Sequence, residues 1–124
     1  MANTATAQTA LPIQTRGVGV NVTPYVIAID TVDTDLTIIT PANSSAMAVV
    51  VGLMFSESTA ANITFKSGST TLLKVELSGS QGLYLPLGDQ VYLATQPGEA
   101  LKIQSSAAIT NMLMFVAETS RVCL

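Results

Sequence analysis

The sequence predicts an all-β fold: an antiparallel β-sandwich preceded by an extended N-terminal arm. Short apolar segments rich in Val, Ile and Thr recur between turn residues at regular spacing, and no segment has the apolar period of an amphipathic helix. At 124 residues the chain has the length of one domain with its own core. We therefore expect an arm over residues 1–20 and one sandwich domain over residues 21–124.

The expected arm is rich in Ala, Thr, Gln and Gly and has few large apolar side chains. Such a segment buries too little surface to offset the entropy lost on ordering it. It is therefore either a disordered terminus or an arm that orders on a partner protein. In the second case we expect the partner to be bound by Leu11, Ile13, Arg16 and Val18.

The first strands expected in the domain are Tyr25–Ile29 and Leu36–Thr40, which flank an Asp-containing turn. A longer strand is expected at Ala46–Phe55, because its run of three valines restricts χ1 and favours strand over helix. Gly52 inside this strand predicts a bulge or a close approach of another backbone.

The middle of the chain predicts a β-hairpin. Asn62–Lys66 alternates polar and apolar residues, so Ile63 and Phe65 should lie on one face. A tight connection at Ser67–Ser69 leads into a second alternating segment, Thr70–Leu77.

Four more strands are expected at Leu83–Leu85, Gln90–Leu93, Glu99–Gln104 and Asn111–Glu118. The last of them is apolar on both faces, with Met112, Met114 and Val116 on one and Leu113 and Phe115 on the other. This indicates either a core on one side and a subunit interface on the other, or a central strand covered by loops.

The composition leaves little catalytic chemistry. The chain has no His and one Cys, which excludes Ser-His-Asp and Cys-His nucleophiles and a structural zinc site. The acidic cluster Asp30, Asp33 and Asp35 lacks the turn glycine and distal Glu of an EF-hand loop, which favours a solvated turn over a Ca²⁺ site. We expect no catalytic residue, no metal, no cofactor, no small-molecule substrate and no enzymatic activity.

The charges point to protein partners. Only 10% of residues are charged, against about 25% in ordinary globular domains, so part of the surface should pack on other protein. The five basic residues are scattered, which argues against nucleic-acid binding. The longest apolar run, Ala46–Phe55, is too short to cross a membrane, and the N-terminus lacks a secretion-signal pattern.

Four motifs carry a family resemblance: ANITFKSGSTTL at 61–72, GLYLPL at 82–87, PGEALKI at 97–103 and SSAA at 105–108. In this order they resemble small β-sandwich structural proteins of tailed bacteriophages, several of which look like capsid decoration, or cement, proteins. The resemblance covers about residues 61–118. The chain departs from it at Gln90–Tyr92, where a Trp-containing segment is frequent, and in its longer N-terminal half.

The resemblance implies a jelly-roll-like sandwich that assembles as a homotrimer on the outer surface of the capsid. Its partner would be the major capsid protein, and its location the virion after synthesis in the host cytoplasm. The alternative is a tail or fibre component that binds a receptor or glycan, since jelly rolls also serve as lectins. The lack of Trp and the 5% aromatic content argue against this alternative.

Overall fold

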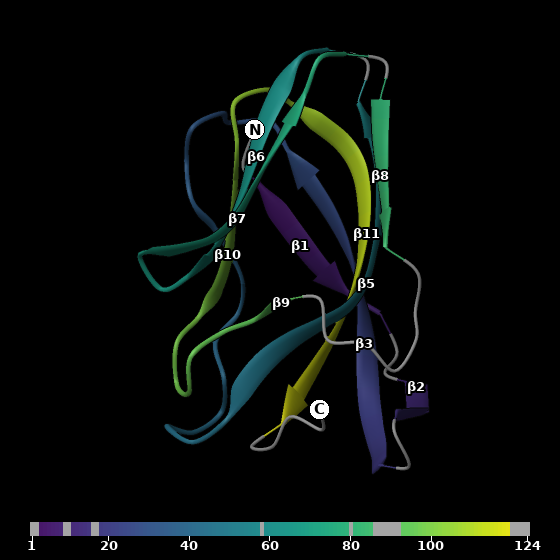
Figure 1. Cartoon of the computed structure of the whole chain (residues 1–124), viewed down its shortest axis with the longest axis vertical. Helices are drawn as coiled ribbons and strands as arrows, with labels where there is room; N and C mark the ends of the chain where they lie inside the picture. The colour runs from purple at the N-terminus through teal and green to yellow at the C-terminus, as the bar shows by residue number, and fades with distance from the viewer. Residues whose placement is uncertain are drawn as a thin grey trace.

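Two antiparallel sheets form the fold in the computed structural model, which describes residues 3–8, 11–15, 18–57, 59–79, 81–85 and 93–119. The strands are β1 (Thr4–Ala7), β2 (Leu11–Thr15), β3 (Val18–Ile29), β4 (Leu36–Ile39), β5 (Met47–Glu57), β6 (Ala61–Ser67), β7 (Thr70–Leu77), β8 (Gln81–Leu85), β9 (Leu93–Ala94), β10 (Leu101–Ser105) and β11 (Ile109–Thr119). The two sheets lie face to face, with β11, β5 and β8 in one layer and β6, β7 and β10 in the other (Figure 1). The predicted all-β sandwich is therefore confirmed.

The strand order is that of a jelly roll. Sheet A has the order β1-β3-β11-β5-β8, with β2 also paired to β3 and β9 to β5, and sheet B has the order β4-β10-β6-β7. Without β1, β2 and the short β9, eight strands remain. The first, eighth, third and sixth form one sheet, and the second, seventh, fourth and fifth form the other. This interleaving of two Greek keys is the jelly-roll arrangement.

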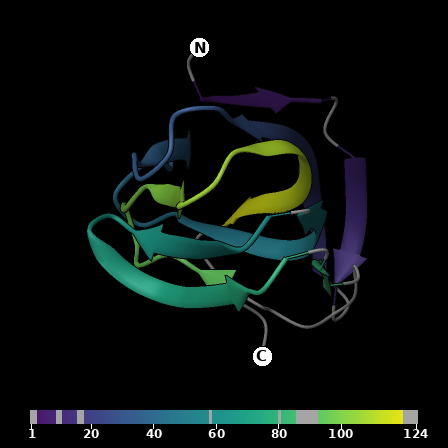
Figure 2. The same ribbon diagram turned by 90° about the horizontal axis from the view of Figure 1, so that it is seen from above.

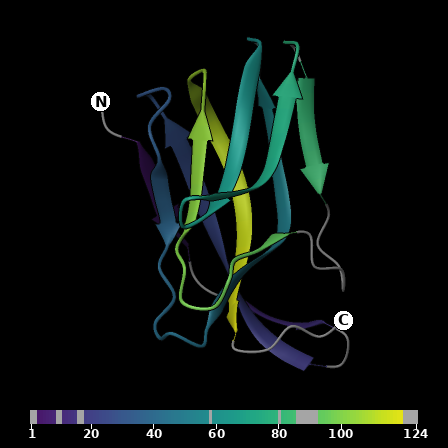
Figure 3. The same ribbon diagram turned by 60° about the vertical axis from the view of Figure 1, so that its left-hand side comes forward.

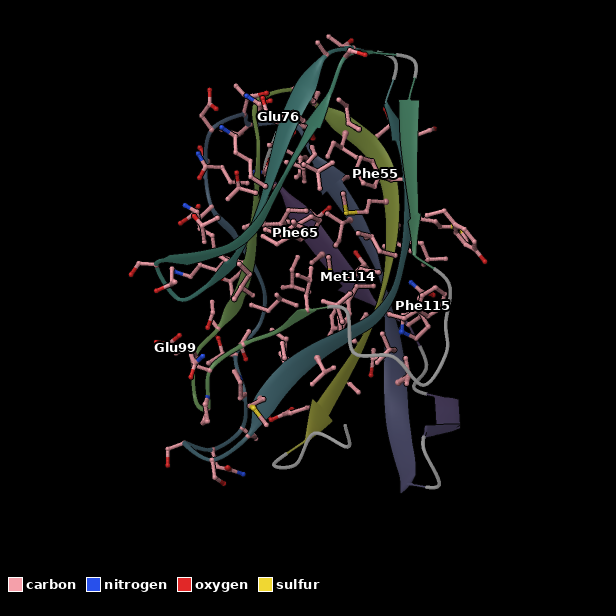
Figure 4. The ribbon with its side chains drawn as sticks, in the orientation of Figure 1. Phe55, Phe65, Glu76, Glu99, Met114 and Phe115 are labelled. Carbon is pink, nitrogen blue, oxygen red and sulfur yellow. The ribbon has the colours of Figure 1, made fainter. Side chains whose placement is uncertain are left out.

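The core fills the space between the sheets. Its largest fully buried side chains come from both layers and include Ile27, Leu53, Ile63, Phe65, Leu101, Ile103, Met112 and Met114. Phe65 from β6 and Met114 from β11 both point into this interior (Figure 4). The prediction that Ile63 and Phe65 share a face is confirmed, and so is the inward face of Met112, Met114 and Val116.

The predicted hairpin is also present. β6 and β7 pair antiparallel from Ala61 with Leu77 to Ser67 with Thr70, so Gly68 and Ser69 form a two-residue turn. Gly68 has a φ of 59°, a left-handed conformation that glycine adopts without steric cost.

The bulge expected at Gly52 lies in β5. Phe115 pairs with Gly52 and Val116 with Val50, so Val51 is an extra residue with no partner on β11. The bulge reverses the alternation along β5: Val50 faces the core before it, and Leu53 faces the core after it. The prediction from Gly52 is confirmed.

The observed strands mostly begin and end within one or two residues of their expected bounds, and the largest difference is in β3. β3 begins at Val18, so the expected boundary between residues 20 and 21 falls inside a strand. β10 starts at Leu101, two residues later than expected, because residues 97–100 form a turn and its exit. Of the strand expected at Gln90–Leu93, only Leu93 lies within the described residues, as the first residue of β9.

Candidate interaction surfaces

The N-terminal segment forms one long β-hairpin with β3. β1 pairs with the second half of β3, from Thr4 with Ala28 to Ala7 with Tyr25. β2 pairs with the first half, from Leu11 with Val22 to Thr15 with Val18. β1 and β2 therefore follow one another along the same edge of β3, and β11 occupies the other edge.

Hydrogen bonds of the Asn3 side chain hold the start of β1 in place. The Asn3 side-chain oxygen accepts hydrogen bonds from the backbone N–H groups of Asp30 and Thr31, both at 2.8 Å, and its Nδ2 donates to the Thr31 carbonyl at 2.9 Å. Ala5 packs against the core. β1 lies at the outer margin of the molecule when seen from above (Figure 2). The first part of the expected arm is thus an edge strand of sheet A.

The far half of the hairpin extends beyond the sandwich. β11 pairs with β3 only from Val22 onward, so residues 18–21 pair with β2 and with no other described strand. Figure 3 shows β2 and the beginning of β3 leaving the body of the sandwich together. We call residues 11–15 and 18–21 the ribbon.

Three of the four residues expected to bind a partner lie in this region. Leu11 and Ile13 belong to β2, and Val18 is the first residue of β3. In the ladder, Leu11 is opposite Val22, Ile13 is opposite Val20 and Val18 is opposite Thr15. Arg16 lies outside the described residues. The structure thus brings three of the four into one two-stranded element.

The outer face of sheet B is polar. Inward-facing Ile63 and Phe65 on β6 alternate with Asn62, Thr64 and Lys66, which face outward. Their ladder partners on β10 and β7 continue this outward set with Lys102, Gln104, Lys74 and Glu76. The Lys66 ammonium is 2.8 Å from an Asp35 carboxylate oxygen and also donates to the Gln104 side-chain oxygen at 2.8 Å. Because this ion pair is partly exposed, it adds little stability.

Part of the outer face of sheet A is apolar. On β11, Leu113, Phe115 and Ala117 alternate with the inward-facing Met112, Met114 and Val116 and therefore face outward. Each of the three lies in a row with its pairing partners on the neighbouring strands. The rows are Val26–Leu113–Met54–Tyr84, Pro24–Phe115–Gly52 and Val22–Ala117–Val49. Phe115 lies on the side of the sheet opposite Met114 (Figure 4).

The third row is already covered. Val22, Val49, Val51 and Ala117 form a second apolar cluster, each at most 5% exposed, and Phe115 packs partly against it. The first row is left open at one end, where Met54 is 42% exposed and Tyr84 63%. Both sides of β11 are thus apolar: one faces the core and the other faces a partly covered surface.

Buried polar groups serve the fold near the β9–β10 turn. Ser67 is fully buried; its hydroxyl donates to a Glu99 carboxylate oxygen at 2.5 Å and accepts from the Gln96 backbone N–H at 2.9 Å. Thr95 is also buried, and its hydroxyl accepts from the Ala48 N–H at 2.9 Å. These bonds satisfy backbone donors that the sheets leave unpaired.

The acidic residues do not gather. Within the described part of the chain, no group of three or more His, Cys, Asp or Glu side chains is placed to hold a metal ion. Asp35 pairs with Lys66, and Asp33 has a φ of 55° in the turn before β4. Burial, and secondarily the negative charge of Glu118, raise the pKa of Tyr25 above its usual value. No helix long and apolar enough to span a membrane occurs among the described residues.

Comparison with known proteins identifies no family for this chain. No protein-family model matches the chain, and no curated protein matches it. Among solved structures it is similar to a chain from the work "Bacillus endospore appendages form a novel family of disulfide-linked pili", with a TM-score of 0.49. The identity is 13%, and the match covers 79% of this chain and 85% of that chain.

Proposed function

We propose that this chain is a structural virion protein, a decoration protein that binds the outer surface of an assembled phage head as a homotrimer and stabilises the shell. The observation that carries the proposal is the ribbon, a two-stranded extension of β2 and β3 beyond the sandwich. The resemblance of the motifs between residues 61 and 118 to phage decoration proteins supports the phage head as the binding partner.

An isolated two-stranded ribbon is at best marginally stable in water. Its outer strand, β2, has an unpaired edge within the described residues and carries Pro12, a residue typical of edge strands. Such an element becomes ordered when a neighbouring protein pairs with it or covers it. The major capsid protein is the neighbour that we propose.

A decoration protein stabilises a shell because it binds the assembled lattice and not the free subunits. This role needs no catalytic residue, metal or cofactor, and we propose none. The polar outer face of sheet B, with its lysines and Glu76, suits a surface that stays in water.

The test removes the ribbon and leaves the sandwich. Residues 12–21 are replaced by Asn-Gly, a two-residue turn that joins Leu11 directly to its ladder partner Val22. The matched control replaces Gly68-Ser69, the two-residue turn between β6 and β7, by Asn-Gly. Both variants are compared with the natural chain in co-sedimentation with assembled shells and with unassembled capsid subunits.

We expect the natural chain and the turn control to bind shells and not free subunits, and the ribbon deletion to bind at least tenfold more weakly while keeping its urea midpoint. Equal binding by the ribbon deletion would reject the role of the ribbon. Failure of the natural chain to bind shells, with binding to glycans or to tail particles instead, would favour the fibre alternative.

A further inference from the structure

We infer that the partner of the ribbon binds it by adding a β-strand to the outer edge of β2, at Pro12 and Gln14. The inference rests on the proposed function for the identity of the partner, which is an extended segment of a subunit in the assembled shell. It specifies how that segment is recognised: by hydrogen bonds between backbones, the mode of strand addition to a sheet edge.

One hydrogen bond fixes the direction of the backbone groups of β3. The Gln8 N–H donates to the Pro24 carbonyl at 2.8 Å, so this carbonyl faces the edge of β3 along which β1 and β2 lie. The N–H and C=O groups of successive residues alternate in direction along a strand. Val20, four residues before Pro24, therefore faces the same edge and is hydrogen-bonded to its ladder partner Ile13.

The residues on either side of Ile13 face the other way. Because Ile13 bonds to β3, the backbone groups of Pro12 and Gln14 are directed away from β3, toward the outer edge of β2. Proline has no N–H, so this edge presents the Pro12 carbonyl and both the N–H and the carbonyl of Gln14. No described strand pairs with this edge.

These backbone groups decide what can cover the ribbon. A protein that covered this edge and excluded water would leave the N–H and the carbonyl of Gln14 without partners, which is costly. An added strand avoids this cost, because its own acceptors and donors recur every two residues, the spacing between Pro12 and Gln14. It would also give the two-stranded ribbon a third strand, which an isolated hairpin lacks for stability of its own.

The outer edge of sheet B differs from that of the ribbon. β7 carries Lys74 and Glu76, and its ladder with β6 contains a register shift. Charged residues and bulges are features by which natural sheets prevent strand pairing at an edge. β2 has no charged residue, and its ladder with β3 is regular. Pro12 removes one donor from this edge and leaves both backbone groups of Gln14 open to a partner.

The experiment compares Gln14→Pro with Gln14→Ala in co-sedimentation with assembled shells. Both variants lose the same side-chain amide, but only Gln14→Pro also loses the outward N–H and places a ring on the edge. The natural ribbon already has a proline with this outward direction at Pro12, so the hydrogen bonds between β2 and β3 should remain. NMR of the free variants verifies this through the Hα–Hα contact between Pro12 and Asn21, which is short where a ladder pair is not hydrogen-bonded.

We expect the natural chain and Gln14→Ala to bind shells alike. Gln14→Pro should bind at least tenfold more weakly, because a hydrogen bond is lost and the ring keeps the added strand away. The inference is overturned, and the proposed function stands, if Gln14→Pro binds as well as Gln14→Ala while deletion of the ribbon still prevents binding.

Two further outcomes would also decide against strand addition. If Pro12 and Asn21 show no Hα–Hα contact in the free natural chain, Pro12 and Gln14 face β3 and the inference is wrong. If the natural chain does not bind shells at all, the proposed function fails and the inference fails with it.

Discussion

The position of Phe65 permits a graded test of the sandwich. Phe65 is 0% exposed on β6 and points into the interior between the sheets. Phe→Ala at such a site loses the transfer energy of the ring and leaves a cavity, which together cost about 3–5 kcal/mol. The whole domain should be stable by about 5–15 kcal/mol, so this one substitution removes a large fraction of the free energy of unfolding.

The assay is equilibrium urea unfolding followed by circular dichroism. With an m-value near 1.5–2 kcal/mol/M for a chain of this size, the urea midpoint should fall by about 2 M. Phe65→Leu, which keeps most of the volume, should cost less than about 1.5 kcal/mol. Thr64→Ala, at the preceding residue and on the opposite face of β6, should cost less than about 1 kcal/mol.

The order of these three losses is the result that matters. If Thr64→Ala destabilised the protein as much as Phe65→Ala, the two faces of β6 would be wrongly assigned. If Phe65→Ala changed the midpoint by less than about 0.5 M, Phe65 would not lie in a packed interior.

Three further outcomes are expected from named contacts. Ser67→Ala should lower the free energy of unfolding by about 1–3 kcal/mol in urea unfolding, because it leaves the Gln96 N–H unsatisfied. Gly98→Ala should cost about 1–2 kcal/mol in the same assay, since φ is 80° and the new Cβ would lie 3.2 Å from the Ser44 Cα and carbonyl oxygen. Tyr25 binds its proton more tightly in the folded state because its folded pKa is raised. The free energy of unfolding that this proton adds is therefore fully present below the unfolded pKa of 10.0, and it is lost as the pH rises through the raised folded pKa. Tyr25→Phe should therefore flatten the alkaline fall of stability in urea midpoints measured between pH 8 and about 11.

Local pattern predicted the strands whose partners lie on both sides. β6 and β10 alternate because one face of each meets the core, and that period is visible in the residues themselves. β11 is apolar on both faces, and its length and apolar residues predicted it. β1 was not predicted as a strand because three of its four residues are exposed and small or polar. It is ordered by backbone pairing with β3 and by the hydrogen bonds of the Asn3 side chain. Those bonds join Asn3 to Asp30 and Thr31, which are 27 and 28 positions away in the sequence.

The sequence predicted that the candidate surfaces exist, but it did not predict which strands form them. The two-sided apolar pattern of β11 already indicated a second buried face, and the low charge fraction indicated a protein partner. Neither could indicate that β3, β5 and β8 extend that face in one row, because the row depends on the ladder and not on local sequence. The ribbon was predicted as an arm, but its pairing with β3 required the register of the hairpin.

The bulge in β5 determines which of its side chains reach the outer face of sheet A. Side chains alternate along a strand, so if β5 continued through Val51 without a bulge, the inward set that ends at Val50 would continue to Met54, and Leu53 and Phe55 would face outward. The bulge instead places Leu53 and Phe55 in the core and Met54 beside Tyr84 on the outer face. A single irregularity, indicated in the sequence by Gly52, therefore determines both which side chains of β5 fill the sandwich and which lie on the outer face of sheet A.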